Sequence, residues 1–259
     1  MIITTQSKGI ATVTLSRADV KNAFNDQMIE SLISAFENIT NDESVRVAII
    51  RAEGDCFCAG ADLNWMKSMA DYSLEQNEAD SARLARLFEV MHTLPIPLIA
   101  EVQGAAFGGG VGLVACCDIV VASPLSKFCL SEVRLGLVPA TISPYVVAAM
   151  GARQAKRWAL TAEIIDSIRA HQIGLVHEIV KHEDLSAYVD NLARKITKNG
   201  PQAVRTTKRL IDYVNDNALD QYLIEDTTQI IAKVRVSDEG QEGMRAFFEQ
   251  RKPSWSNNK

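Results

Sequence analysis

Two short glycine-rich segments are the part of this sequence best suited to stabilise a negative charge. Residues 58–62 (CAGAD) and 108–110 (GGG) each follow an apolar, strand-like run and each precede a helix-like run. The first backbone N–H groups of a helix lack intrahelical acceptors and lie at the positive end of the helix dipole. Two such groups brought together can hold a carbonyl oxygen as it becomes an oxyanion. We therefore predict that the amides of Ala61 and Gly109 form such a pair, although glycines in turns more often serve only tight bends and close packing.

A carboxylate follows a third strand-like run. Glu132 comes after the apolar residues 128–130 and before a turn that contains glycine, where a polar side chain can point into a cleft. A partly apolar pocket would raise the pKa of this carboxyl toward the range useful for acid–base catalysis. A lone glutamate at a strand end is far more often solvated. The residues alone leave both interpretations open.

These segments resemble the signature of the crotonase (enoyl-CoA hydratase/isomerase) superfamily. The matching runs are 57–63 (FCAGADL), 104–110 (GAAFGGG), 117–119 (CDI) and 128–136 (FCLSEVRLG), and the resemblance extends from 21–25 (KNAFN) to 247–253 (FFEQRKP). It implies an α/β fold of the crotonase type, a spiral of β-β-α units with a C-terminal helical region for oligomerisation. It also implies an acyl-CoA substrate, with CoA as part of that substrate and no separate cofactor, and assembly as a homotrimer or a dimer of trimers.

The resemblance also implies roles for individual residues. Glu132 would be catalytic, and Ala61 and Gly109 would hold the oxyanion. For Asp62, capping of the following helix is an alternative to substrate contact. The acyl-CoA-binding residues that the resemblance implies are Asn22, Ala23, Ala59, Asp62, Leu63, Asn64 and Gly108.

One position departs from the hydratase pattern. Hydratases of this family usually carry a second glutamate two residues after the triple glycine, where it helps to position the attacking water, and this chain has Gly112 there. Related double-bond isomerases can use a single glutamate at the later position. In a hydratase without this glutamate, we expect the substrate's own carboxylate, or a side chain from Thr141, Ser143 or Tyr145, to orient the water. The alternative is that the space left by the missing side chain only admits a bulkier or charged acyl group.

The leading functional prediction is an enoyl-CoA hydratase. The runs 62–66 (DLNWM), 131–137 (SEVRLGL) and 142–144 (ISP) look most like a subgroup assigned as methylglutaconyl-CoA hydratases. The nearest rival is an enoyl-CoA isomerase that uses Glu132 alone. A rival of another class is a non-catalytic protein that binds acyl-CoA or RNA through the basic cluster Arg205, Lys208 and Arg209. A net charge of −5 argues against nucleic-acid binding.

Strands and helices must alternate to place these residues. Strand-like runs cover residues 10–15, 45–51, 98–102, 119–122 and 127–130. Asn25 can cap a helix, another helix ends before residues 95–97, and Ser237 can cap the last helix. From residue 185 onward the pattern is helical. We predict a crotonase-like α/β core over residues 1–195 and a helical trimerisation region over 196–259.

The bulk properties fit an ordinary globular enzyme. With 47% hydrophobic and 23% charged residues, the chain can bury a sizeable core. The sequence shows neither a signal-peptide pattern nor an apolar run long enough to span a bilayer, so we expect no membrane association. Its five cysteines lack zinc-site spacing, which predicts free thiols in a cytoplasmic protein and no metal site.

Overall fold

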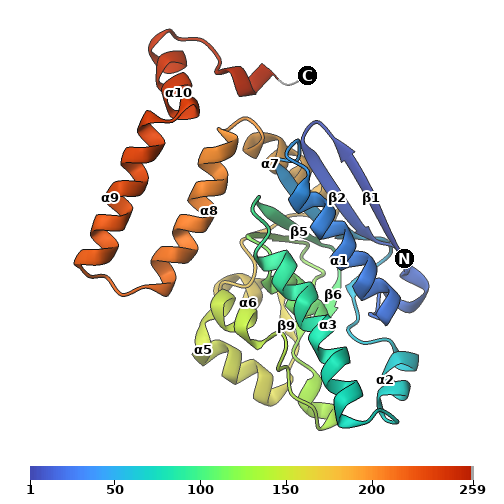
Figure 1. Ribbon diagram of the computed structural model, residues 1–259. Coiled ribbons are helices and arrows are strands. Elements are labelled where there is room, and N and C mark those ends of the chain that lie inside the picture. The colour runs from blue at the N-terminus through green and yellow to red at the C-terminus, as the bar shows by residue number, and fades with distance from the viewer. Residues whose placement is uncertain (258–259) are drawn as a thin grey trace.

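Two β-sheets and the helices that cover them form the body of the molecule, and three helices project from it as an arm (Figure 1). The structure is a computed structural model and describes residues 1–257. The larger sheet has the strand order β1-β2-β3-β5-β7-β10. Its strands are β1 (Ile2–Ser7), β2 (Ile10–Leu15), β3 (Val47–Ala52), β5 (Leu98–Val102), β7 (Ile119–Ala122) and β10 (Glu178–Ile179). Only the β1–β2 pair of this sheet is antiparallel.

The smaller sheet, in the order β4-β6-β8-β9, positions the candidate site. Its strands are β4 (Cys56–Cys58), β6 (Ala105–Phe107), β8 (Lys127–Cys129) and β9 (Ile165–Asp166). β4, β6 and β8 run parallel, whereas β9 pairs antiparallel with β8. The carboxyl ends of β4, β6 and β8 therefore lie at one edge of this sheet.

The helices cover both faces of the larger sheet and extend into the arm. They are α1 (Asp26–Asn41), α2 (Leu63–Met69), α3 (Leu74–His92), α4 (Gly109–Ala115), α5 (Ser143–Thr161), α6 (Ser167–Gln172), α7 (Leu185–Ile196), α8 (Pro201–Asp216), α9 (Gln221–Val236) and α10 (Asp238–Phe248). Four short 3-10 helices are η1 (Ala18–Val20), η2 (Glu132–Leu135), η3 (His182–Asp184) and η4 (Ser254–Asn257).

Strand β3 shows why the larger sheet has helices on both sides. Val47 and Ile49 pack with residues of α7, whereas Ala48 and Ile50 belong to the main core with α1 and α3. All four residues are buried. A parallel strand with two covered faces needs such a continuous apolar run.

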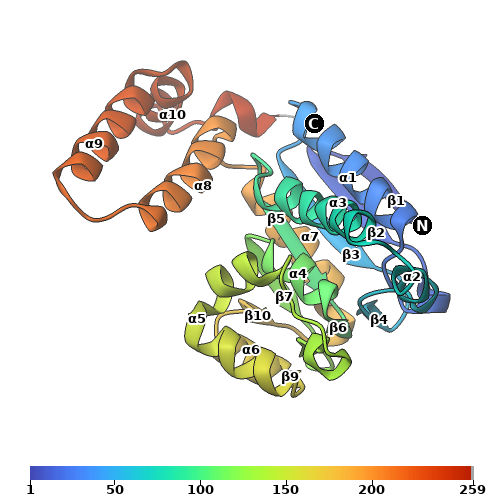
Figure 2. The same cartoon turned by 60° about the horizontal axis from the view of Figure 1, so that its bottom comes forward.

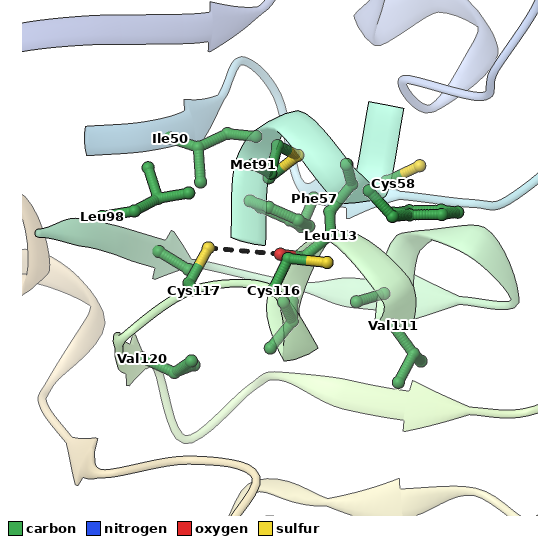
Figure 3. Close-up of a cluster of buried hydrophobic side chains, with 14 of the residues drawn as sticks. Ile50, Phe57, Cys58, Met91, Leu98, Val111, Leu113, Cys116, Cys117 and Val120 are labelled. Atoms are coloured by element: carbon green, nitrogen blue, oxygen red, sulfur yellow. Dashed lines mark hydrogen bonds between the residues drawn. The ribbon is translucent and has the colours of Figure 1, made fainter. Parts of the chain in front are cut away.

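The main core continues behind α4 (Figure 3). Phe57 and Cys58 of β4 pack there with Val111 and Leu113 of α4. All five cysteines are free and buried, and the Cys117 thiol donates a hydrogen bond to the carbonyl of Leu113 at 3.2 Å. Burial raises the pKa of the Cys58 thiol to about 12.

The α/β prediction is confirmed, and most element bounds agree closely. β5 and β7 have the predicted bounds, and Asn25 caps α1 by accepting a hydrogen bond from the Met28 amide at 2.9 Å. β3 begins later than predicted because the Val45 amide closes a turn on the Asp42 carbonyl. Among residues 1–257, no helix is both long and apolar enough to cross a membrane.

Helices α8, α9 and α10 form the arm, which projects from the body in both views (Figures 1 and 2). Lys208 of α8 anchors it through an ion pair with Asp118 at 2.7 Å, and Arg205 donates to the Val45 carbonyl at 3.2 Å. α7 ends at Ile196 and α8 begins at Pro201. The domain division at residue 195 stays a prediction. Residues 258 and 259 of the predicted C-terminal region lie outside the described part of the chain.

Candidate active site

The carboxyl edge of the smaller sheet brings the three principal predicted site residues together. Ala61 follows β4, Gly109 begins α4 directly after β6, and Glu132 follows β8. Because β4, β6 and β8 are parallel neighbours, these three residues leave the sheet at the same edge. Binding sites of parallel sheets form at such edges.

The first amide, that of Ala61, is oriented by an isolated bridge to Phe24. The Phe24 amide donates to the Gly60 carbonyl at 2.7 Å, and the Asp62 amide donates to the Phe24 carbonyl at 2.7 Å. In a parallel bridge these two bonds flank the central residue, so the N–H of Ala61 points away from Phe24. It has no hydrogen-bond acceptor among residues 1–257.

The second amide lies at the first position of α4. Gly108 precedes it with φ of +51°, a left-handed conformation that glycine adopts without strain. The Gly108 amide donates to the Cys129 carbonyl at 2.8 Å, which ties the start of α4 to β8. Within the described chain the N–H of Gly109 meets no acceptor, as expected for the first turn of a helix.

Glu132, the first residue of η2, lies beside this turn. A Cβ placed on Gly108 would be only 3.4 Å from Oε1 of Glu132. The other oxygen, Oε2, is buried and has no hydrogen-bond partner in the described chain. Burial raises the pKa of this carboxyl, partly offset by a hydrogen bond from its own backbone amide. A partly buried carboxyl with one unpartnered oxygen, beside two free amides, is suited to proton transfer.

The alternative interpretation, in which a vacated space beside Gly112 admits a bulkier acyl group, is wrong, because that space is filled. A Cβ on Gly112 would lie 2.3 Å from Cγ2 of Ile142 and 2.8 Å from Cε1 of Phe88. These two apolar side chains fill the volume that a side chain at Gly112 would need. Hydrocarbon therefore occupies the place beside residue 112 where the family pattern has a carboxylate.

Of the three side chains expected to orient water, only Ser143 donates its hydroxyl hydrogen to another residue of 1–257. The Ser143 hydroxyl donates to the Ala140 carbonyl at 2.9 Å. The Tyr145 ring packs against His92, with 5.2 Å between ring centroids, and against Phe88 at 6.0 Å. The third, Thr141, is half-buried, and its hydroxyl makes no hydrogen bond to any residue of 1–257.

The predicted acyl-CoA-binding residues surround the Ala61 turn. Asn22 is fully buried, and its amide donates to the carbonyls of Glu53 and Cys56, so its side chain supports the loop. Ala59 lies against this loop, because its amide donates to the Lys21 carbonyl at 3.0 Å. On the other side of the turn, Leu63 is 75% exposed. The structure does not test ligand contact by any of them.

Asp62 caps α2, as the alternative interpretation of this residue predicts. Its side chain accepts a hydrogen bond from the Asn64 amide at 2.8 Å and forms an ion pair with Arg17 at 3.0 Å. The Asn64 N–H, and then Arg17, hold the pKa of the Asp62 carboxyl below its ordinary value against the opposing effect of burial.

The sequence analysis missed Arg17. Its Nη1 donates to the Ala23 carbonyl at 2.6 Å and its Nη2 to Asp62. Arg17 thus braces the 22–24 loop against the turn that holds Ala61. Position 17, just after the end of β2, carries no recognisable local motif, and its partner Asp62 lies 45 residues away.

The predicted basic cluster on α8 does not form one free surface. Arg205 and Lys208 are used to attach the arm, and Lys208 also donates to the Ile96 carbonyl at 3.2 Å. Arg209 is exposed. In the part of the chain that the structure describes, no three His, Cys, Asp or Glu residues gather in a way that could hold a metal ion.

Comparisons with known proteins agree with this geometry. The sequence profile described as enoyl-CoA hydratase/isomerase matches residues 5–258. A solved enoyl-CoA hydratase from Shewanella pealeana is 44% identical with a TM-score of 0.95, covering 98% of this chain and 95% of that one. A mevalonyl-coenzyme A hydratase from Aspergillus fumigatus is 33% identical over 95% of this chain and 91% of its own length. A 2,3-dehydroadipyl-CoA hydratase from Escherichia coli is 29% identical over 98% of both chains.

Proposed function

Since the chain belongs to the enoyl-CoA hydratase/isomerase family, we propose that it is an enoyl-CoA hydratase that adds water across the α,β double bond of an enoyl-CoA thioester. The observation that carries this proposal is the shared edge of β4, β6 and β8. There the free amides of Ala61 and Gly109 accompany the Glu132 carboxyl, whose Oε2 has no hydrogen-bond partner in the described chain.

In the proposed reaction, water adds at the β-carbon and the electrons of the double bond move toward the thioester carbonyl. The amides of Ala61 and Gly109 hold the resulting enolate oxygen, and loss of one such donor typically costs about 2.7–4 kcal/mol. Glu132 delivers a proton to the α-carbon and is protonated again by the water that has added. Burial favours this role, because it keeps the Glu132 carboxyl protonated at higher pH than an exposed glutamate.

For the acyl group we propose methylglutaconyl-CoA or a close relative, in which a carboxylate of the substrate orients the water. The support is the subgroup resemblance together with the hydrocarbon at Gly112, which removes the protein's own second carboxylate. Two relatives are named for acyl groups that carry a distal oxygen function, mevalonyl and dehydroadipyl. CoA enters as part of the substrate, and we propose no further cofactor.

The test is incubation with short, branched and carboxylated enoyl-CoA thioesters, followed by enone absorbance and product mass. A hydratase removes the enone band and adds the mass of water. If the substrate carboxylate assists, the carboxylated thioester should exceed an uncharged analogue of equal length chiefly in kcat. Equal rates for crotonyl-CoA would exclude that assistance.

A double-bond isomerase is the second candidate, favoured by one observation. The hydratase pattern uses two carboxylates. Because Ile142 and Phe88 pack against Gly112, this chain carries only one of the two, that of Glu132. A single carboxylate can move a proton between two carbons of the acyl chain. The same incubation separates the two reactions, because isomerisation leaves the product mass unchanged. If no thioester is consumed although acyl-CoA binds, the protein is a non-catalytic acyl-CoA-binding protein.

We also propose that the arm assembles the protein into a homotrimer or a dimer of trimers. α8 buries none of its residues, and Phe247 and Phe248 of α10 are 78% and 79% exposed. Apolar surface of this extent is typical of an interface. Light scattering tests the proposal, and a variant with both phenylalanines changed to serine should show a lower mass than the natural protein. An unchanged mass would exclude α10 from the interface.

A further inference from the structure

Two amides act together on one oxygen only if their separation is fixed. Each donor must lie about 2.7–3.1 Å from the oxygen at the moment the charge develops. Ala61 and Gly109 belong to different turns, after different strands. Something must hold one turn at a set distance from the other.

Phe24 contacts the first turn through its backbone. Its amide and carbonyl bond to Gly60 and Asp62, the residues on either side of Ala61, both at 2.7 Å. These two short bonds fix the position of the Ala61 peptide relative to Phe24. They also direct the Ala61 N–H away from Phe24.

The same residue contacts the second turn through its ring. A Cβ on Gly109 would lie 2.8 Å from Cε2 of Phe24 and 3.2 Å from Cδ2. The ring thus packs directly on the backbone of Gly109. Phe24 is only 1% exposed, so neighbouring core side chains prevent the ring from swinging aside.

We propose that Phe24 is a positioning residue that sets the separation of the two amides, holding Ala61 through its backbone and Gly109 through its ring. This inference rests on the proposed function. Replacement of the ring would leave the first contact and remove the second. Gly109 could then shift toward the vacated space, and the two amides would no longer point at one oxygen.

The alternative is that Phe24 only fills the core. Both views predict lower stability when the ring is lost, because a buried aromatic side chain is removed. Only positioning predicts a specific loss of enolate stabilisation. Phe36 of α1 offers a matched control, because it is also fully buried in the same core.

The experiment compares Phe24→Leu with Phe36→Leu, using acetoacetyl-CoA as the probe. This β-ketothioester enolises, and its enolate absorbs in the near ultraviolet, so the band of the bound probe reports enolate stabilisation without turnover. Phe24→Leu should weaken the band and lower kcat by about 10- to 100-fold, the scale expected for a misplaced catalytic group, with KM changed less than about twofold. Phe36→Leu should lower the melting temperature comparably and leave the band and kcat near their natural values.

A second pair of variants tests the contact itself. Gly109→Ala should lose activity because its methyl meets the Phe24 ring. In the Phe24→Leu background the same methyl has more room, so the double variant should lose less activity than the product of the two single losses. Phe24→Met, which keeps most of the volume without the ring, replaces Phe24→Leu if circular dichroism shows the latter unfolded.

The outcomes distinguish the inference from the function on which it rests. A natural protein that gives an enolate band, with a Phe24 variant that matches it in band and kcat, would overturn the positioning role alone. Equal activity losses for Phe24→Leu and Phe36→Leu would also overturn it. A natural protein without an enolate band and without turnover of any enoyl-CoA would overturn the proposed function and this inference together.

Discussion

Glu132 and Gly112 occupy the two positions at which the family pattern places carboxylates, and their surroundings are opposite. Glu132 keeps its carboxyl, with one buried oxygen that meets no partner in the described chain. Gly112 has no side chain, and Ile142 and Phe88 take up the space around it. Glu132 thus presents a carboxyl with an unsatisfied oxygen, whereas Gly112 lies in tightly packed apolar core.

The contrast shows that Gly112 does not adjoin an empty pocket that a carboxylate side chain could enter. If Gly112 adjoined an empty pocket, restoring a glutamate there would be straightforward. Because hydrocarbon fills the volume, a glutamate at position 112 would also require a smaller side chain in place of Ile142. Of these two positions only Glu132 therefore carries a carboxylate, and in the proposed hydration another group must orient the water.

The largest expected effect is at Glu132. Glu132→Gln removes the titrating group with little change in shape, so turnover of the best enoyl-CoA should fall by about 10²–10⁴-fold. Binding of a saturated acyl-CoA, measured by calorimetry, should stay near its natural affinity. A glutamine variant with the natural rate would show that Glu132 is not the acid–base group.

Gly112→Glu should be the next most damaging change. Forcing a side chain into a packed core typically costs about 1–3 kcal/mol, and a buried unpaired carboxylate adds to that cost. Denaturant unfolding should show this loss, with no gain in crotonyl-CoA hydration. Adding Ile142→Ala should recover part of the stability. Full stability of Gly112→Glu alone would mean that the core can rearrange around Gly112.

Arg17→Met should have a moderate effect on turnover, because Arg17 supports the turn that holds the Ala61 amide without itself being placed at the reacting atoms. Loss of the bonds to Ala23 and Asp62 would loosen the turn that carries Ala61, and hydrogen bonds to charged groups contribute about 1.5–3 kcal/mol each. We expect kcat to fall by about 10-fold with KM less affected. Arg86→Met is the control, because its ion pairs with Glu37 and Glu89 are exposed. Equal kinetic losses in both variants would argue against the brace.

The smallest effect concerns stability and pH. The folded-state pKa of Glu132 is raised above its ordinary value of 4.5, so the folded state holds this proton more tightly than the unfolded chain. Its contribution to stability is complete below pH 4.5 and is lost as the pH rises through the raised pKa. As the pH rises from 4.5 to neutral, the natural protein should therefore lose a little stability that Glu132→Gln keeps, so the difference in denaturant midpoint between the two proteins should shift in favour of the variant. A constant difference across this range would contradict the raised pKa.

Local signals in the sequence were enough to predict much of the fold, whereas the choice of Glu132 also needed the family resemblance. The glycine turns and the Asn25 cap each depend on a few adjacent residues, and the structure places them as expected. Parallel strand order then brings the three turns together. The roles of Ala61, Gly109 and Glu132 in chemistry stay predictions.

Contacts between distant segments could not be predicted in this way. The Arg17–Asp62 pair, the Phe24 ring on Gly109 and the packing of Ile142 on Gly112 each join residues that lie far apart in the sequence. Each depends on how loops meet after the strands have paired. The sequence shows that position 112 lacks the carboxylate of the family pattern, but only the packing shows that Ile142 and Phe88 occupy the space beside it.

The buried cysteines can be used to measure local opening of the folded protein, because a buried thiol reacts only when the structure around it opens. The thiolate is the form that attacks an electrophilic thiol reagent, and burial raises the pKa of Cys58 to about 12 and raises those of Cys116 and Cys117 well above their ordinary value. Labelling at these positions therefore waits for the surrounding structure to open. Cys58 reports on β4, which leads into the Ala61 turn. Cys116 and Cys117 belong to the main core at the end of α4, so their labelling reports opening of that part of the core.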